Sequence, residues 1–373
     1  MIVLLLVLIF STAFSVAAVA LVLRLSHRKG WYDHIDERKI HSGDVPRIGG
    51  IGFAVAFLLF ITCAGIVYAG KGLDVLKYWP CAVAMVIIVL SGVYDDFRPM
   101  EPKYKLILQI IAGICVLIPG FTFDRIIYFG GGFLTNLGFW EYPVTLLWVV
   151  GLANAINLID GVDGLAGGLS ALIAFFLGLI FFSFVGVSKA VILCACLFGV
   201  LIGFLIFNAP IPRAKIFMGD CGSQFLGFTL ALLPIMKEPD THSSLPVLYA
   251  AALFVIPIFD TIAAVWRRLR DGKKISDPDK SHLHHKLINL GLSARGVDGL
   301  IFTLQIIIGI LTFIAVHLDG SPSLFVIGAV YLLALAFFTV VHFMNRAFDN
   351  RKAAGNTGEA GMRPPSNNTN EIC

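Results

Sequence analysis

The stretch PVTLLWVVGLANAINLIDGVDGLAGGLSALIAFFLGLIFFSFV, residues 143–185, holds two apolar runs that are separated by a short acidic loop rich in glycine. Each run comes close to the ~20 apolar residues that a helix needs to cross a bilayer. Membrane proteins rarely place ionisable groups beside lipid without a use for them. The stretch therefore predicts two membrane helices with a polar, functional turn between them.

The whole chain has the composition of an integral membrane protein. Of its 373 residues, 58% are hydrophobic and only 14% are charged, whereas soluble domains carry about 25% charged residues. We place spans at residues 2–23, 48–69, 79–94, 104–119, 143–159, 165–185, 190–208, 222–236, 244–266, 300–318 and 322–344. We therefore expect an all-α integral membrane protein with about eleven transmembrane helices.

The basic residues predict the orientation. If the N-terminus lies outside, the outer loops hold only five of the 28 Lys and Arg residues, namely Lys71, Lys77, Arg125, Lys189 and Lys237. Positive charge collects in the cytoplasmic loops of membrane proteins. The odd number of spans then places the C-terminus in the cytoplasm. No basic stretch precedes the first run, so we interpret that run as a retained helix rather than a signal peptide.

Two segments stand apart from the predicted spans. The segment FDRIIYFGGGFLTNLGF, residues 123–139, has two aromatic and β-branched stretches divided by three glycines, which predicts a short external β-hairpin. Residues 346–373 are rich in Gly, Asn, Pro and charge, and we expect a disordered cytoplasmic tail there. Residues 1–345 then form a single transmembrane domain with cytoplasmic loops.

Adjacent acids end the third predicted span, in GVYDDFRPMEPKYKLILQ, residues 92–109. Asp95 and Asp96 would lie at the cytoplasmic rim, close to Lys105 of the next span. Two carboxylates that lie close together push their pKa values apart, so one can act as a base while the other holds a metal. A solvated helix edge is the alternative interpretation.

The segment NAINLIDGVDGLAGG, residues 154–168, is the most specific motif of the chain. Asn154, Asn157 and Asp160 are spaced by three residues, so a helix stacks them on one face. Asp163 follows, and the glycines allow a tight turn in which the backbone approaches a ligand closely. A plain acidic turn is the alternative.

The segment FMGDCGS, residues 217–223, places Asp220 directly before the eighth span. The helix dipole alone favours an acid at a helix start. Asp220 is also a hard oxygen ligand of the kind that Mg²⁺ takes together with substrate phosphates, and Asn157 can add an amide oxygen. Asn208, at the inner end of the seventh span, is a weaker candidate for substrate contact.

Three histidines lie in DPDKSHLHHKLINLG, residues 277–291, within the most basic loop. Zinc is one interpretation of His282, His284 and His285. No cysteine lies nearby, so we favour hydrogen bonds from the imidazoles to phosphate or sugar oxygens. Asp260, an acid inside the ninth span, is a candidate to brace this histidine loop.

The first inner loop contains RKIHSGDVPRIGGIG, residues 38–52. Lys39, His41 and Arg47 are candidates to face an anion. A loop that is basic only because it is cytoplasmic explains these residues almost as well.

These motifs, in this order, resemble the polyprenyl-phosphate N-acetylhexosamine-1-phosphate transferases, a glycosyltransferase family with bacterial and eukaryotic members. The resemblance covers about residues 38–291 and rests on Asp95-Asp96, residues 157–163, FMGD and HLHH. HLHH is similar to the UDP-GlcNAc branch rather than to the muramyl-pentapeptide branch. Cys221 departs from the family, which usually has a small Ala or Thr there.

The resemblance implies that a sugar-1-phosphate passes from a UDP-N-acetylhexosamine to undecaprenyl phosphate, with release of UMP. It implies Mg²⁺, with Mn²⁺ as a substitute, at Asp220 and Asn157. Asp95 and Asp96 would deprotonate or orient the lipid phosphate, and Asp163 joins them as a catalytic candidate. The expected substrate contacts are Arg47, Lys105, Asn157, Asp160, Asn208, His282, His284 and His285.

The same resemblance implies a place in the cell. We expect a multi-pass protein of the bacterial cytoplasmic (inner) membrane that starts a cell-surface polysaccharide such as O-antigen. Its active site would face the cytoplasm, among membrane lipids. No nucleic-acid partner is expected, and a homodimer is compatible with the sequence. Direct attack by the lipid phosphate and a covalent intermediate both stay open, and we favour direct attack.

Two other classes of protein also stay open. A magnesium-dependent lipid phosphatase or phospholipid head-group transferase would share the carboxylates but needs no UDP-sugar pocket. A transporter would bury its ionisable groups near mid-bilayer, where this sequence clearly places only Asp260.

Overall fold

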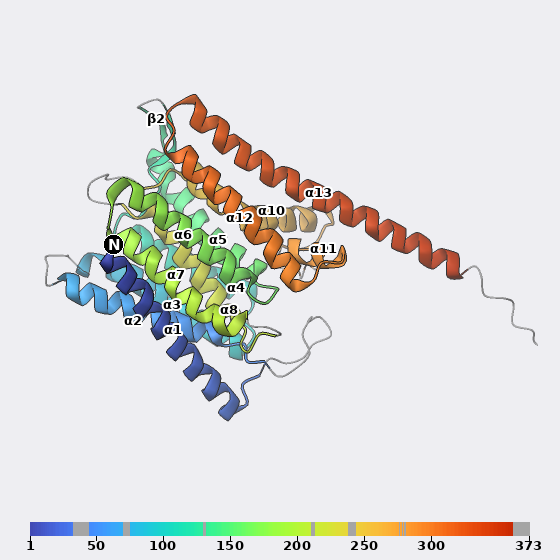
Figure 1. Cartoon of the computed structure of the whole chain (residues 1–373), viewed down its shortest axis with the longest axis horizontal. Helices are drawn as coiled ribbons and strands as arrows, with labels where there is room; N and C mark the ends of the chain where they lie inside the picture. Colours follow the sequence, from blue (N-terminus) through green and yellow to red (C-terminus); the bar gives the residue numbers. More distant parts are fainter. Residues whose placement is uncertain are drawn as a thin grey trace, which may run out of the picture.

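The computed structural model describes residues 1–32, 45–69, 75–129, 132–209, 213–237, 244–275, 277, 279 and 281–360. Lys39 and His41 lie outside these residues. The long helices form one bundle (Figure 1). The bounds of all the helices in the described residues are α1 Ile2–Lys29, α2 Gly49–Ala69, α3 Trp79–Phe97, α4 Pro102–Leu117, α5 Glu141–Ile159, α6 Leu165–Val185, α7 Lys189–Asn208, α8 Gly219–Leu232, α9 Val247–Leu253, α10 Val255–Arg270, α11 Leu283–Asn289, α12 Ala294–Val316 and α13 Ser321–Ala360. Short 3₁₀ turns cover Val75–Tyr78, Gly138–Trp140 and Leu233–Ile235.

Local sequence signals explain several helix starts. α3 and α4 have a proline in their first two positions, where the missing N–H costs nothing. Ser188 and Ser293 cap α7 and α12, and their hydroxyl oxygens accept the backbone N–H groups of Val191 and Gly296. The apolar runs between such signals become helices.

Each of the eleven predicted spans coincides with helix, but their lengths differ. Within the described residues, eight helices are long and apolar enough to cross a membrane, or nine if the bent pair α9–α10 counts as one span. The two remaining predicted spans correspond to α4, of 16 residues, and α8, of 14. Since both are short for a perpendicular crossing, the number of crossings and the orientation stay predictions.

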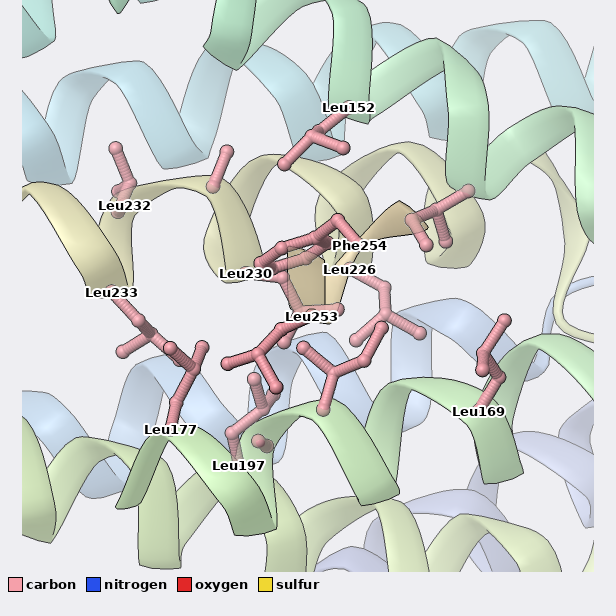
Figure 2. Close-up of a cluster of buried hydrophobic side chains, with 14 of the residues drawn as sticks. Leu152, Leu169, Leu177, Leu197, Leu226, Leu230, Leu232, Leu233, Leu253 and Phe254 are labelled. Atoms are coloured by element: carbon pink, nitrogen blue, oxygen red, sulfur yellow. The ribbon is translucent and has the colours of Figure 1, made fainter. Parts of the chain in front are cut away.

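α8 lies at the centre of the bundle, and nearly all of its residues are buried. It packs against α2, α3 and α5. Figure 2 shows Leu226 and Leu230 of α8 in one apolar cluster with Leu253 and Phe254 at the α9–α10 break. A helix enclosed by protein does not need the length of a bilayer, which explains the shortness of α8.

Small residues let α8 approach its neighbours closely. A side chain at Gly50 of α2 would meet the backbone of Gly222, and one at Gly92 of α3 would meet the backbone of Cys221. The backbone N–H of Gly50 donates to the carbonyl of Met218 at 2.8 Å. Helices in membranes associate through such close contacts between small residues.

The sequence prediction of a hairpin matches two strands, β1 Arg125–Phe129 and β2 Gly132–Asn136, which pair antiparallel with Ile127 opposite Leu134. β2 lies at the opposite end of the bundle from α11 (Figure 1). Its place outside the membrane stays a prediction.

The helix α13 runs past the domain boundary that we predicted at residue 345. It continues to Ala360 and extends beyond the bundle (Figure 1). Residues 361–373 lie outside the described part, and the division into a transmembrane domain and a disordered tail stays a prediction. The continuation has a local cause, because the amide of Asn345 donates to the carboxylate of Asp349 one turn later, at 2.9 Å.

We predict that Gly50→Ala destabilises the fold, because the added methyl overlaps the backbone of Gly222, which cannot move aside. Overpacking of this kind costs about 1–3 kcal/mol. The midpoint of thermal unfolding in detergent should fall. Gly328→Ala in α13 is the matched control, because nothing lies within 4 Å of the added methyl. The unfolding midpoint of this variant should equal that of the wild type. Equal midpoints for the two variants would contradict the close approach.

Candidate active site

Three acids meet where α3 ends and α8 begins. Asp220, the second residue of α8, accepts a hydrogen bond from the amide of Asn157 at 2.7 Å and pairs with Arg47 at 3.2 Å. Lys105 of α4 pairs with Asp95 and lies 3.9 Å from Asp220. With Asp96, which binds the backbone of Asp220, the structure thus brings together six of the residues that the sequence predicts for the site.

Asp96 has a different task from Asp95. Its two carboxylate oxygens accept the backbone N–H groups of Asp220, at 2.7 Å, and of Cys221, at 3.0 Å. The first amides of a helix have no partner within the helix, so Asp96 caps α8 from the neighbouring helix. Asp96 therefore positions α8, and its expected contact with the lipid phosphate stays a prediction, because each carboxylate oxygen can accept more than one hydrogen bond.

A chain of amides runs behind these acids. The side-chain amide of Asn154 donates to Gln109 at 2.7 Å, and the amide of Gln109 donates to Gln224 at 3.1 Å. Gln109 and Gln224 are buried, so each must find its partner inside the protein. The sequence analysis missed Gln224, although its place four residues after Asp220 is a signal that helical spacing offers.

The acidic loop between α5 and α6 is held at its α6 end. Asp163 accepts the backbone N–H of Ala214 at 3.2 Å, and Gly164 has a φ of 85°, which favours glycine. The side-chain oxygen of Asn208 accepts the N–H of Gly164 at 3.0 Å, and its amide donates to the carbonyl of Ile216 at 3.0 Å. Because both ends of Asn208 bind backbone, it positions two loops, and its contact with a substrate stays a prediction.

Asp160 carries a perturbed carboxyl group. Burial raises the pKa of Asp160 from 3.8 to about 7. The positive charge of Arg47 lowers this pKa to a smaller extent, and the negative charges of Asp220 and Asp163 raise it slightly. A carboxyl group poised near neutral pH is a common property of functional sites.

The histidine segment contacts the acidic loop. Asp260 of α10 binds the imidazole of His282 and accepts the N–H of Leu283, both at 2.8 Å, so the prediction that Asp260 braces this segment is confirmed. A side chain at Gly161 would overlap the His284 ring. Burial, and then the neighbouring His285, lowers the pKa of His284 to about 3, so this imidazole is neutral at pH 7.

The sequence analysis also missed a buried acid near the same loop. Asp298, early in α12, is 5% exposed, and Arg295 one turn before it donates to the carbonyl of Ala209 at 3.0 Å. Asp298 lies 3.6 Å from where a side chain of Gly164 would begin. Asp298 lies two residues before the predicted span 300–318, so the available signal was an acid at the end of an apolar run, as for Asp95.

The donor atoms suit magnesium better than zinc. No group of three His, Cys, Asp or Glu side chains within the described ranges is arranged to hold a metal ion. Mg²⁺ does not need such a cage, because it binds one or two carboxylates and completes its shell with water and substrate phosphates. Asp220 fits this role, and Asn157 still has its amide oxygen to offer, since its nitrogen donates to Asp220 and Ser223.

An apolar groove lies on the surface beside the site. It has a volume of about 400 Å³ between α3 and α4, and its lining residues are Tyr94, Met100, Glu101, Tyr104, Ile107 and Leu108. Lys105 follows Tyr104 in the chain, so the charged centre and the groove are adjacent on α4.

The chain is similar in sequence to known proteins. The model of glycosyl transferase family 4 matches residues 78–238, which contain all the acids described above except Asp260 and Asp298. Relatives match nearly the whole chain. A probable undecaprenyl-phosphate N-acetylglucosaminyl 1-phosphate transferase of Bacillus subtilis is 33% identical over 88% of this chain and 89% of its own length.

Two further relatives carry the name undecaprenyl-phosphate alpha-N-acetylglucosaminyl 1-phosphate transferase. The protein from Yersinia pestis is 31% identical over 89% of both chains, and that from Escherichia coli K12 is 30% identical over 87% of this chain and 86% of its own. The chain therefore belongs to glycosyl transferase family 4, and the resemblance expected from the motifs is confirmed.

We predict that Asp160 makes stability depend on pH. Between pH 4 and 7 the folded protein keeps the proton on Asp160, whereas the unfolded chain has lost it, so stability falls as the pH rises through this range. With EDTA present to remove divalent ions, the unfolding midpoint of the wild type should fall between these pH values. Asp160→Asn should show a smaller fall. An identical pH dependence in both proteins would argue against the raised pKa.

Proposed function

We propose that this protein transfers N-acetylglucosamine-1-phosphate from UDP-GlcNAc to undecaprenyl phosphate and releases UMP. The proposal rests on the contacts of Asp220 at the start of the central helix α8, where its carboxylate lies beside the cations of Arg47 and Lys105. Phosphoryl transfer needs charge neutralisation and alignment of this kind more than it needs covalent chemistry. The activity for which the relatives are named agrees with this assignment.

The proposed reaction breaks one phosphoanhydride bond and forms another. An oxygen of the lipid phosphate attacks the phosphorus that carries the sugar, and the bond from that phosphorus to UMP breaks. The second pKa of a phosphate monoester is about 6, so the acceptor is largely dianionic near neutral pH. The attack then requires no base, and direct displacement in line is the simplest course.

The residues divide between the two substrates. Lys105, oriented by its ion pair with Asp95, holds the acceptor phosphate. Arg47 and Asp220 lie where the donor pyrophosphate binds, and Mg²⁺ held by Asp220 and Asn157 supplies further neutralisation of its charge. Asp160 and Asp163 face the nucleotide, and neutral His284 offers an N–H to the donor.

The lipid acceptor also fits the location of the site. The groove between α3 and α4 offers apolar surface for the first isoprene units next to Lys105. The site then lies at the cytoplasmic face of a bacterial inner membrane, where the reaction begins a cell-surface polysaccharide such as O-antigen.

The test is incubation of purified protein with Mg²⁺, undecaprenyl phosphate and a panel of UDP-sugars, with release of UMP as the measurement. UDP-GlcNAc should give UMP and a lipid-linked sugar, and EDTA should stop the reaction. A CDP-alcohol replaces the donor in a parallel reaction. Turnover of that compound but of none of the UDP-sugars would assign the protein to the head-group transferases instead.

Asp220→Asn should lower the rate of UMP release by a factor of about 100 or more, the scale on which single electrostatic groups contribute to catalysis. Asp319→Asn is the matched control, because Asp319 is exposed and lies beyond the end of α12. It should keep the wild-type rate. Full activity of the Asp220 variant would remove this carboxylate from the site.

Gly161→Ala should raise the KM for UDP-GlcNAc more than the KM for the lipid, because its methyl displaces His284 from the acidic loop. In Gly151→Ala, within α5, nothing lies within 4 Å of the added methyl, and both constants should stay unchanged. An unaltered donor KM in the Gly161 variant would separate the histidine segment from donor binding.

A further inference from the structure

The chain breaks sharply between α9 and α10. The two helices meet at an angle of 85° around Phe254. Pro257 is the third residue of α10, and proline has no backbone N–H. The carbonyl of Leu253, four residues earlier, therefore lacks the donor that a continuous helix would provide. Leu253 is fully buried, so water cannot replace that donor.

Gln305 supplies the missing donor. It comes from α12, is fully buried, and its side-chain amide donates to the carbonyl of Leu253 at 3.0 Å. Its side-chain oxygen has no hydrogen-bond partner in the described part of the chain. A buried amide with one unsatisfied end costs about 1–3 kcal/mol. The bond at the break offsets that cost.

The direction of α10 matters because of what it carries. Asp260 lies six residues after Phe254, about 9 Å along the helix at 1.5 Å per residue. A change of 20° in the bend would move Asp260 by about 3 Å at that radius. Since Asp260 holds both His282 and the start of α11 at 2.8 Å, such a shift breaks both hydrogen bonds.

We propose that Gln305 is a positioning residue, which holds the α9–α10 break at its observed angle and so keeps the histidine segment against the acidic loop. Gln305 touches none of the acids described above, so it acts on the site only through Leu253, α10 and Asp260. The kinetic consequence rests on the proposed function, while the structural consequence does not.

The kinetic test compares two variants of α12. Gln305→Met keeps the length of the side chain and removes the donor. Thr312→Val removes a fully buried hydroxyl, seven residues later, that has no partner among the described residues. Gln305→Met should raise the KM for UDP-GlcNAc by about tenfold or more, since a displacement of ~1 Å can cost about 100-fold, and leave the KM for the lipid unchanged. Thr312→Val should change neither constant.

A merely structural role predicts another pattern. If Gln305 only stabilised the bundle, Gln305→Met would lower the amount of folded protein and the apparent kcat and would leave both KM values unchanged. That outcome would overturn the proposal.

A distance measurement tests the break without any turnover. Spin labels at Trp266 of α10 and Leu147 of α5, which are 65% and 75% exposed, report the direction of α10. The reactive natural cysteines are replaced beforehand. Gln305→Met should shift or broaden the distance distribution, and Thr312→Val should not. An unchanged distribution would refute the role of Gln305 even if the wild type proves to have another activity.

Discussion

The cap that Asp96 places on α8 is the interaction on which the rest of the site depends. The start of α8 lies inside the bundle, where its first amides cannot find water, and a carboxylate from α3 binds two of them. One turn earlier in α3, Gly92 lets the helices come close enough for this contact. With its backbone fixed in this way, Asp220 can direct its own carboxylate to Arg47, Lys105 and Asn157.

Around that fixed point, the site is assembled from segments distant in sequence. The acidic loop is clamped by Asn208 from one side and touched by His284 from another. Asn208 is a buried polar group with two defined backbone partners, and in a low-dielectric interior such contacts are strong because the alternative is an unsatisfied group. The arrangement is therefore rigid before any substrate arrives, which is what electrostatic catalysis requires.

Much of the fold and of the candidate site was predictable from the sequence, and there are physical reasons why the other features were not. Apolar length locates the helices. The rarity of acids beside lipid identified Asp95 and Asp220 at the ends of spans and Asp260 within one. The pattern of apolar residues does not show that a helix such as α8 is surrounded by protein and can therefore be short. It also does not show in which direction the chain continues after a break such as the one at Pro257. The separate roles of Asp95 and Asp96 depend on which amides lie within reach, and that is a property of packing between helices. Gln224 and Asp298 each have a weak signal, helical spacing from Asp220 and a place beside an apolar run, but they went unnoticed because neither belongs to a longer motif.

The amide chain from Asn154 through Gln109 to Gln224 bears on how the protein is built in the cell. These three side chains come from α5, α4 and α8, and each bond has a direction, donor to acceptor. Sliding one helix by a single turn against the others would strand several donors and acceptors away from water at once. Helices inserted one after another during synthesis thus have a single mutual register in which both hydrogen bonds form, and the same register brings Lys105 to both Asp95 and Asp220.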